Sequence, residues 1–104
     1  MRVAIQGTRG AFSEAAARLR WPGLELVPCR DVGDVATAVR EGRADAGCLP
    51  IENSLVGSVT PTYDLLHEAF GDGALHLAAE ILLPVHHALM ARPGATVSGI
   101  KRAA

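Results

Sequence analysis

Short apolar runs alternate with helical segments through the first sixty residues, and this alternation most restricts the fold. The runs at 3–6, 24–27 and 44–51 are too short for buried helices and predict strands. A segment of helical periodicity separates each run from the next. Because parallel strands need a crossover of this kind, the pattern predicts βαβ units and an α/β fold with a mostly parallel sheet.

Both connecting segments have the spacing of amphipathic helices. The first places four apolar side chains on one expected face: Phe12, Ala15, Ala16 and Leu19. Trp21-Pro22-Gly23 ends this helix, and Gly42 ends the second, which covers 32–39. The small residues of the third strand, Ala46-Gly47-Cys48, suit a sheet that is covered on both faces.

The chain after Thr60 predicts a third helix and then further strands. Thr60 is a candidate cap, followed by Pro61 in the first turn. The helix has an apolar face of Leu65, Leu66, Ala69 and Phe70, and ends at a turn over 71–73. Strands are expected at 75–85 and 87–91, then a turn at 92–94 and the opening of a helix from Thr96.

Composition excludes several classes of function. Of 104 residues, 49% are hydrophobic and 4% aromatic, and the formal net charge is −1. Since the longest basic cluster is Lys101-Arg102, nucleic-acid binding is not expected. No apolar run is long enough to cross a bilayer, and the first residues lack the zones of a signal peptide. Cys29 and Cys48 match no metal spacing and indicate free thiols in a reducing cytoplasm.

The loop after the first strand, residues 7–13, has the composition of an anion site. Gly7 and Gly10 permit close backbone approach, and a helix N-terminus follows them. Ser13 is a candidate cap or ligand donor. A tight turn followed by a helix cap explains the same residues, so both interpretations stay open.

The stronger candidate is the run PIENSLVGSVT from Pro50 to Thr60, directly after the third strand. Its polar side chains are Glu52, Asn53, Ser54, Ser58 and Thr60. Ligands of open α/β sheets bind at the carboxyl ends of strands, and these groups supply an amide and hydroxyls for a small carboxylate. Asn, Ser and Gly are also common turn residues, which leaves a turn cluster as the alternative.

Two further groups are not expected to carry chemistry. Adjacent residues on a strand point to opposite faces, so His86 and His87 are not expected to bind one metal ion. One of them is expected in the floor of a cleft. Asp45 is interpreted as a solvated residue at the start of a strand.

Five blocks, in order, resemble the prephenate dehydratase family. They are GTRGAFSEAAA at 7–17, VPC at 27–29, the segment 44–59 containing PIENSLVGSV, YDLL at 63–66 and LPVHHALMARPG at 83–94. Gln6-Gly7, residues 10–14 and Val85-His86-His87 are especially similar to the arogenate dehydratase branch. The resemblance covers essentially the whole chain but only about the first half of the family's catalytic domain.

The resemblance implies a lyase that converts prephenate to phenylpyruvate, or arogenate to phenylalanine, with loss of carbon dioxide and water. It implies one lobe of a type II periplasmic-binding-protein-like fold over residues 1–78, and a hinge strand with the start of a second lobe over 79–104. No cofactor or metal is implied. The substrate-binding positions it implies are Gly10, Ala11, Phe12, Ser13, Asn53, Ser54, Gly57 and Ser58. Glu52, Thr60 and His86 are expected to orient these binding residues without contacting the substrate themselves.

The chain also departs from the family pattern. The Thr-Arg-Phe segment, whose threonine is taken as the catalytic acid, lies downstream in the family and is absent here. The chain is therefore expected to be an incomplete, inactive domain. Arg9 replaces the usual Pro or Glu and adds positive charge at the cleft mouth. The alternatives are a non-catalytic carboxylate-binding or interaction lobe, or a periplasmic solute-binding fragment, which the missing signal peptide disfavours.

An apolar strand at Leu89-Met90-Ala91 without enough partners predicts self-association, and a homo-oligomer is expected.

Overall fold

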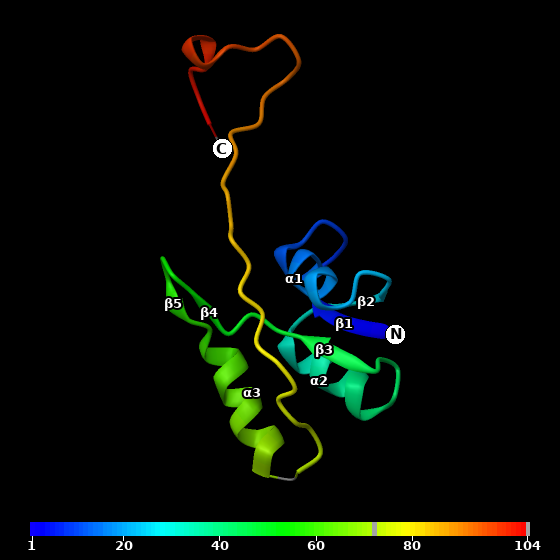
Figure 1. The fold of residues 1–104 in the computed structure, drawn as a ribbon. Helices are drawn as coiled ribbons and strands as arrows, with labels where there is room; N and C mark the ends of the chain where they lie inside the picture. The colour runs from blue at the N-terminus through cyan, green and yellow to red at the C-terminus, as the bar shows by residue number, and fades with distance from the viewer. Residues whose placement is uncertain (72, 104) are drawn as a thin grey trace.

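A three-stranded parallel sheet with the order β2-β1-β3 lies at the centre of the fold (Figure 1). Its strands are β1 (Arg2–Gln6), β2 (Glu25–Cys29) and β3 (Ala46–Cys48). Val3 of β1 pairs with Leu26 on one side and with Ala46 on the other. The computed structural model describes residues 1–71 and 73–103, and the predicted α/β fold with a parallel sheet is confirmed.

Side chains of β1 alternate between two hydrophobic clusters, one on each face of the sheet. Val3 and Ile5 are fully buried and belong to a cluster with Ala17 of α1 (Phe12–Arg20). Ala4 belongs to the other cluster with Val35 and Ala38 of α2 (Val32–Arg40). Because successive residues of a strand point to opposite faces, one helix covers each face, as the small residues of the third strand predicted.

The buried face of α1 is not the predicted one. Ala17 is fully buried, whereas Phe12 and Leu19 are 58% and 61% exposed. Alanines occupy three consecutive positions, 15–17, so the apolar pattern fits several helix faces. The sheet selects the face with the smallest side chains because they allow the helix to approach most closely.

After β3 the chain forms an antiparallel ribbon and then a helix. β3 is shorter than the predicted run, and β4 (Glu52–Asn53) pairs with β5 (Gly57–Ser58). In α3 (Thr60–Gly71) the predicted face includes buried Ala69, while the Phe70 side chain and Asp72 lie outside the described residues. None of the helices in the described parts of the chain is long and apolar enough to cross a membrane.

The prediction that Thr60 caps α3 is wrong. The carbonyl of Val59 accepts hydrogen bonds from the N–H groups of Thr62 and Tyr63, at 2.9 and 3.3 Å. A carbonyl that accepts the first helical bonds belongs to the N-cap residue, so Val59 occupies this position. Thr60 lies inside the first turn and is exposed.

The strands predicted at 75–85 and 87–91 are wrong. Both segments are irregular, and the helix expected from Thr96 is a single 3-10 turn, η1 (Val97–Gly99). A strand needs a neighbour for its N–H and C=O groups, and no strand in the described residues pairs with either segment. In the view of Figure 1 the yellow part of the segment crosses the body, and the orange part extends away from the sheet. The Cα radius of gyration is 16.6 Å, against about 13 Å for a compact chain of similar length.

The contact between β3 and α2 generates a stability prediction. A Cβ added at Gly47 would lie 2.7 Å from Cγ1 of Val35, a residue that is 1% exposed. Valine in a helix has one strongly preferred rotamer and cannot turn aside. We expect Gly47→Ala to lower the free energy of unfolding by about 1–3 kcal/mol in chemical denaturation.

Gly23→Ala is the matched control, because a Cβ there meets no heavy atom within 4 Å. Combining Gly47→Ala with Val35→Ala should cost less than the sum of the single changes, since the second change removes the clashing methyl. Equal unfolding midpoints for Gly47→Ala and Gly23→Ala would contradict the predicted clash.

Candidate functional site

The loops after β1 and β3 lie at the same edge of the sheet. β1 and β3 run parallel, and Ile5 near the end of β1 pairs with Cys48 at the end of β3. The chain adds β2 on one side of β1 and then crosses to add β3 on the other. Where the strand order reverses in this way, the loops leave toward opposite faces and open a ligand-binding crevice. The fold thus brings the two predicted segments, 7–13 and 50–60, to this switch point.

The β1–α1 loop uses two of its four candidate N–H groups internally. The N–H of Ala11 donates to the carbonyl of Thr8 at 3.1 Å, and the N–H of Gly10 donates to Oε2 of Glu14 at 2.7 Å. Gly10 has φ of +86°, which favours glycine at this turn. Of the loop positions predicted to bind, only Phe12 and Ser13 keep N–H groups with no acceptor among the described residues.

Ser13 was a candidate cap of α1, but it does not cap this helix. The N-cap residue is Ala11, whose side chain cannot accept a hydrogen bond. Glu14 reaches back to the N–H of Gly10, one residue before the N-cap, which fixes the loop but leaves the first N–H groups of α1 without a side-chain cap. The hydroxyl of Ser13 is consequently not used as a cap.

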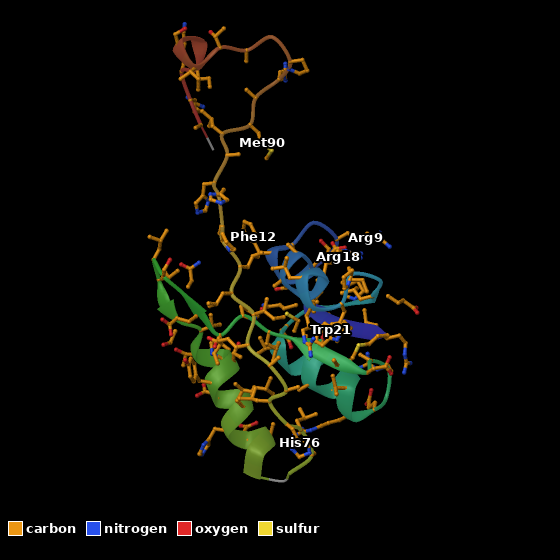
Figure 2. The ribbon with its side chains drawn as sticks, in the orientation of Figure 1. Arg9, Phe12, Arg18, Trp21, His76 and Met90 are labelled. Carbon is orange, nitrogen blue, oxygen red and sulfur yellow. The ribbon has the colours of Figure 1, made fainter. Side chains whose placement is uncertain are left out.

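Glu14 was not among the predicted site residues, although its spacing from the loop was a usable signal. Its Oε1 accepts a hydrogen bond from Nε of Arg18 at 2.9 Å and lies 2.8 Å from Nη2 in the ion pair, and its side chain is 12% exposed. The hydrogen bond from Gly10, followed by the one from Arg18, lowers the pKa of Glu14. In Figure 2, Arg18 and Phe12 project to opposite sides of α1.

The β4–β5 ribbon orients Asn53. Its Oδ1 accepts from the N–H groups of Leu55 and Val56 at 2.8 and 3.3 Å, which closes the turn. The interpretation of this segment as a turn therefore explains the role of the amide oxygen but not that of the amide nitrogen. Oδ1 is occupied and Nδ2 remains as a pair of donors. The side chains of Ser54 and Ser58 are exposed, and no hydrogen bond joins Glu52 to Asn53 or Ser54 in the described part of the chain.

A buried threonine anchors the base of this ribbon. Thr62 of α3 is 1% exposed, and its Oγ1 donates to the carbonyl of Pro50 at 2.7 Å. The N–H of Val59 donates to the carbonyl of Ile51 at 2.9 Å. Thr62 was missed because its partner is a backbone carbonyl twelve residues away, which no local pattern marks.

His86 and Asp45 lie in different surroundings from the site residues. His86 and His87 are exposed on the irregular segment, so the argument that placed them on opposite faces of a strand does not apply. The described residues contain no group of three or more metal-ligating side chains. Asp45 is a solvated residue at the start of β3, as predicted. A hydrogen bond from Arg2 lowers its pKa and joins β1 to β3 at the end opposite the site.

The two cysteines are free and lie on opposite faces of the sheet. Cys29 belongs to the cluster under α2, and Cys48 packs against the cluster under α1. β1 separates their strands, so they cannot form a disulfide with each other in this fold. Burial raises the pKa of both thiols, which keeps them protonated near neutral pH.

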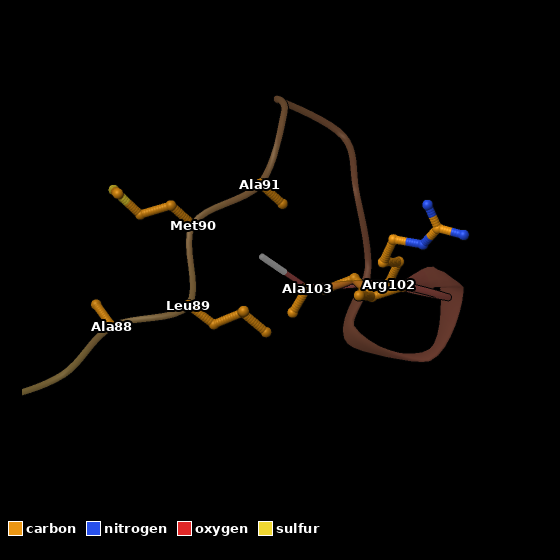
Figure 3. Close-up of a pocket in the computed structure, with 7 residues that line it drawn as sticks. Ala88, Leu89, Met90, Ala91, Arg102 and Ala103 are labelled. Atoms are coloured by element: carbon orange, nitrogen blue, oxygen red, sulfur yellow. The ribbon is translucent and has the colours of Figure 1, made fainter.

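Among the hollows of the described structure, two open ones each have a volume of about 400 Å³. One lies at the ends of β1 and β2 and is lined by Gly7, Thr8, Pro28, Cys29 and Arg30. The guanidinium of Arg30 is already paired with the carboxylate of Asp34, with Nε and Oδ2 3.0 Å apart. The other, far along the irregular segment, is lined by 88–91, Ile100, Arg102 and Ala103 (Figure 3). It contains none of the predicted site residues, and the guanidinium of Arg102 points away from it.

Comparison with known proteins gives one consistent family. The family model described as prephenate dehydratase matches residues 3–104. Arogenate dehydratase 5, chloroplastic, of Arabidopsis thaliana is 48% identical over 103 residues, covering 98% of this chain and 23% of its own length. Arogenate dehydratase 2 of Petunia hybrida is 42% identical over 102 residues, covering 98% of this chain and 25% of its own.

A third relative, arogenate dehydratase/prephenate dehydratase 2, chloroplastic, of Arabidopsis thaliana, is 42% identical over 104 residues, with 98% and 26% coverage. The chain thus spans about a quarter of the length of these relatives. No solved structure matches it.

The anchor at Thr62 generates a second prediction. We expect Thr62→Val, which keeps the shape but loses the hydroxyl, to lower the free energy of unfolding by about 1–3 kcal/mol, because the Pro50 carbonyl loses its donor. Amide exchange of Val59 at the ribbon base should accelerate. Thr62→Ser should restore slow exchange, and Thr37→Val, at an exposed position of α2, is the control. Unchanged exchange of Val59 in Thr62→Val would show that the hydroxyl does not anchor the ribbon.

Proposed function

The chain belongs to the prephenate dehydratase family, and from this premise we propose that it forms one wall of the substrate site of a prephenate or arogenate dehydratase. The wall binds the carboxylates of the cyclohexadienyl substrate. The whole protein then releases carbon dioxide and water to form phenylpyruvate or phenylalanine.

The observation that supports this most directly is the position of the two loops. The segments that the family resemblance marks for binding follow β1 and β3, at the point where the strand order reverses. Each loop is also held by a helix side chain: Glu14 accepts a hydrogen bond from the N–H of Gly10, and Thr62 donates one to the carbonyl of Pro50. Donors fixed in advance lose little entropy when a ligand binds.

The proposed roles follow from the free donors. Nδ2 of Asn53, the N–H groups of Phe12 and Ser13, and the hydroxyls of Ser13, Ser54 and Ser58 hold carboxylate oxygens. Gly57 has φ of +82° and allows the ribbon to turn without a side chain over the site. Glu52, Thr60 and His86 remain proposed supporting residues.

The reaction itself needs little from this wall beyond orientation. Loss of carbon dioxide aromatises the ring, while the departing hydroxyl must take up a proton to leave as water. None of the residues assigned here is proposed to supply that proton. In this proposal the chain binds and orients the substrate, and a group outside the described residues transfers the proton.

We further propose a reducing compartment and a homo-oligomer. The free thiols of buried Cys29 and half-buried Cys48 support the first, and the cytoplasm is the predicted location. Because the Arabidopsis relatives are named as chloroplastic, fractionation of the source cells decides between the two compartments.

Asn53 provides the test of binding. Asn53→Asp keeps an oxygen to accept from Leu55 and Val56 but replaces the donor by a negative charge. We expect it to retain the unfolding midpoint and to bind phenylpyruvate about 10–100-fold more weakly in calorimetric titration, as for loss of a hydrogen bond to a charged group. Asn53→Ala should lose the turn as well as affinity, and Ser98→Ala is the remote control.

Unchanged affinity in Asn53→Asp would remove the amide from the site. Absence of binding in the unaltered chain would refute the proposed substrate wall. Binding by the whole protein without turnover would support the alternative, a non-catalytic carboxylate-binding lobe.

The oligomer proposal has its own test. Leu89 and Met90 are 63% and 90% exposed on the irregular segment. We expect sedimentation to give a mass that rises with concentration, and Leu89→Lys with Met90→Lys to return it toward the monomer because exposed apolar surface is removed. A single monomeric species at all concentrations would contradict the proposal.

A further inference from the structure

Glu14 is a half-buried carboxylate beside the proposed site, and the binding scheme above gives it no contact with substrate. Its two oxygens divide between partners. Oε2 accepts the N–H of Gly10 at 2.7 Å, and Oε1 accepts Nε–H of Arg18 and is ion-paired with its guanidinium. Its side chain is 12% exposed, so the carboxylate is shielded from solvent but completely hydrogen-bonded.

This arrangement decides which donors the loop presents. With the N–H of Gly10 bound to Glu14 and that of Ala11 bound to Thr8, the next two N–H groups have no acceptor within residues 1–71 and 73–103. These are Phe12 and Ser13, in the first turn of α1, where the helix dipole favours an anion. Removing the bond to Glu14 would free a third donor and release the turn around Gly10.

The charge of Glu14 opposes the binding of an anion, and Arg18 offsets it. A bare carboxylate bonded to the loop would repel a ligand carboxylate at the neighbouring N–H groups. Arg18 donates Nε–H to Oε1 at 2.9 Å and places Nη2 2.8 Å from the same oxygen, so its positive charge lies directly against the carboxylate. Arg9, on the loop itself, adds a second positive charge near Glu14. The loop therefore keeps the Glu14 carboxylate as a hydrogen-bond acceptor, while the positive charges of Arg18 and Arg9 offset its negative charge.

We propose that Glu14 is a positioning residue for the substrate carboxylate, and that Arg18 is the partner whose charge makes this position compatible with an anionic ligand. This inference rests on the proposed function, because it names how that site selects its donors. It differs from a purely structural cap in one respect. A cap contributes to stability alone, whereas here the balance of charge between Glu14 and Arg18 sets the affinity for anions.

A double-mutant cycle on the whole chain separates these two roles. The chains are the unaltered protein, Arg18→Met, Glu14→Gln and the double variant, titrated with phenylpyruvate and with phenylacetone, a ketone without the carboxylate. Arg18→Met should weaken phenylpyruvate binding about tenfold, because it leaves the charge of Glu14 unpaired. The double variant should recover most of this loss, since glutamine accepts the Gly10 N–H without a charge. Binding of phenylacetone should change little across the four chains.

A structural cap predicts the opposite pattern, with the double variant no better than Arg18→Met and both ligands weakened alike. That result would overturn the inference and leave the proposed function standing. If phenylpyruvate binds to none of the four chains, the proposed function and the inference fall together.

The amide resonance of Gly10 gives a measurement that needs no ligand. Because the pKa of Glu14 is lowered in the folded chain, the bond to Gly10 is charge-assisted above pH 4.5, the ordinary value for a glutamate, and weakens as pH falls through the lowered one. We expect the resonance to shift with a midpoint below 4.5 and to lose this shift in Glu14→Gln. A Gly10 resonance that does not respond to pH would overturn the inference whatever the titrations show.

Discussion

β1 is hydrogen-bonded to a strand on each side and covered by a helix on each face, and the rest of the structure depends on this position. Val3, Ala4 and Ile5 are all fully buried, although they point alternately to opposite faces. Such burial requires both α1 and α2 to pack on the sheet, which in turn requires β2 and β3 to lie on opposite sides of β1. One short apolar strand thus determines the arrangement of four other elements.

The functional edge of the sheet is a consequence of the same arrangement. A chain that places its third strand on the far side of its first must send the two following loops apart at the carboxyl end. The loops are then fixed from behind by side chains of the helices, Glu14 on α1 and Thr62 on α3. Helices that build the core therefore also set the geometry of donors that face a ligand. The stability of the helix–sheet core is thereby linked to the conformational order of the two loops of the proposed site.

Errors of the sequence interpretation occur where a local pattern had several possible partners. Phe12 and Leu19 fit an apolar helix face, but the alanines at 15–17 offered the sheet a closer approach. The apolar segment 75–91 has the composition of strands, yet a strand forms only beside another strand, and the described residues provide none for it. Side-chain bonds across the chain, such as that from Thr62 to Pro50, leave no local trace in the sequence.

The amino-acid sequence by itself determined the α/β class, the three parallel strands, the three helices and the two polar segments that follow β1 and β3. It could do so because hydrophobic periodicity, helix-ending residues and turn residues act over a few neighbouring positions. Only the tertiary structure decided which face of α1 is buried, that Oδ1 of Asn53 closes a turn and that Glu14 occupies the N–H of Gly10. These outcomes depend on distances between groups brought together by the fold. A pattern along the chain does not contain such distances.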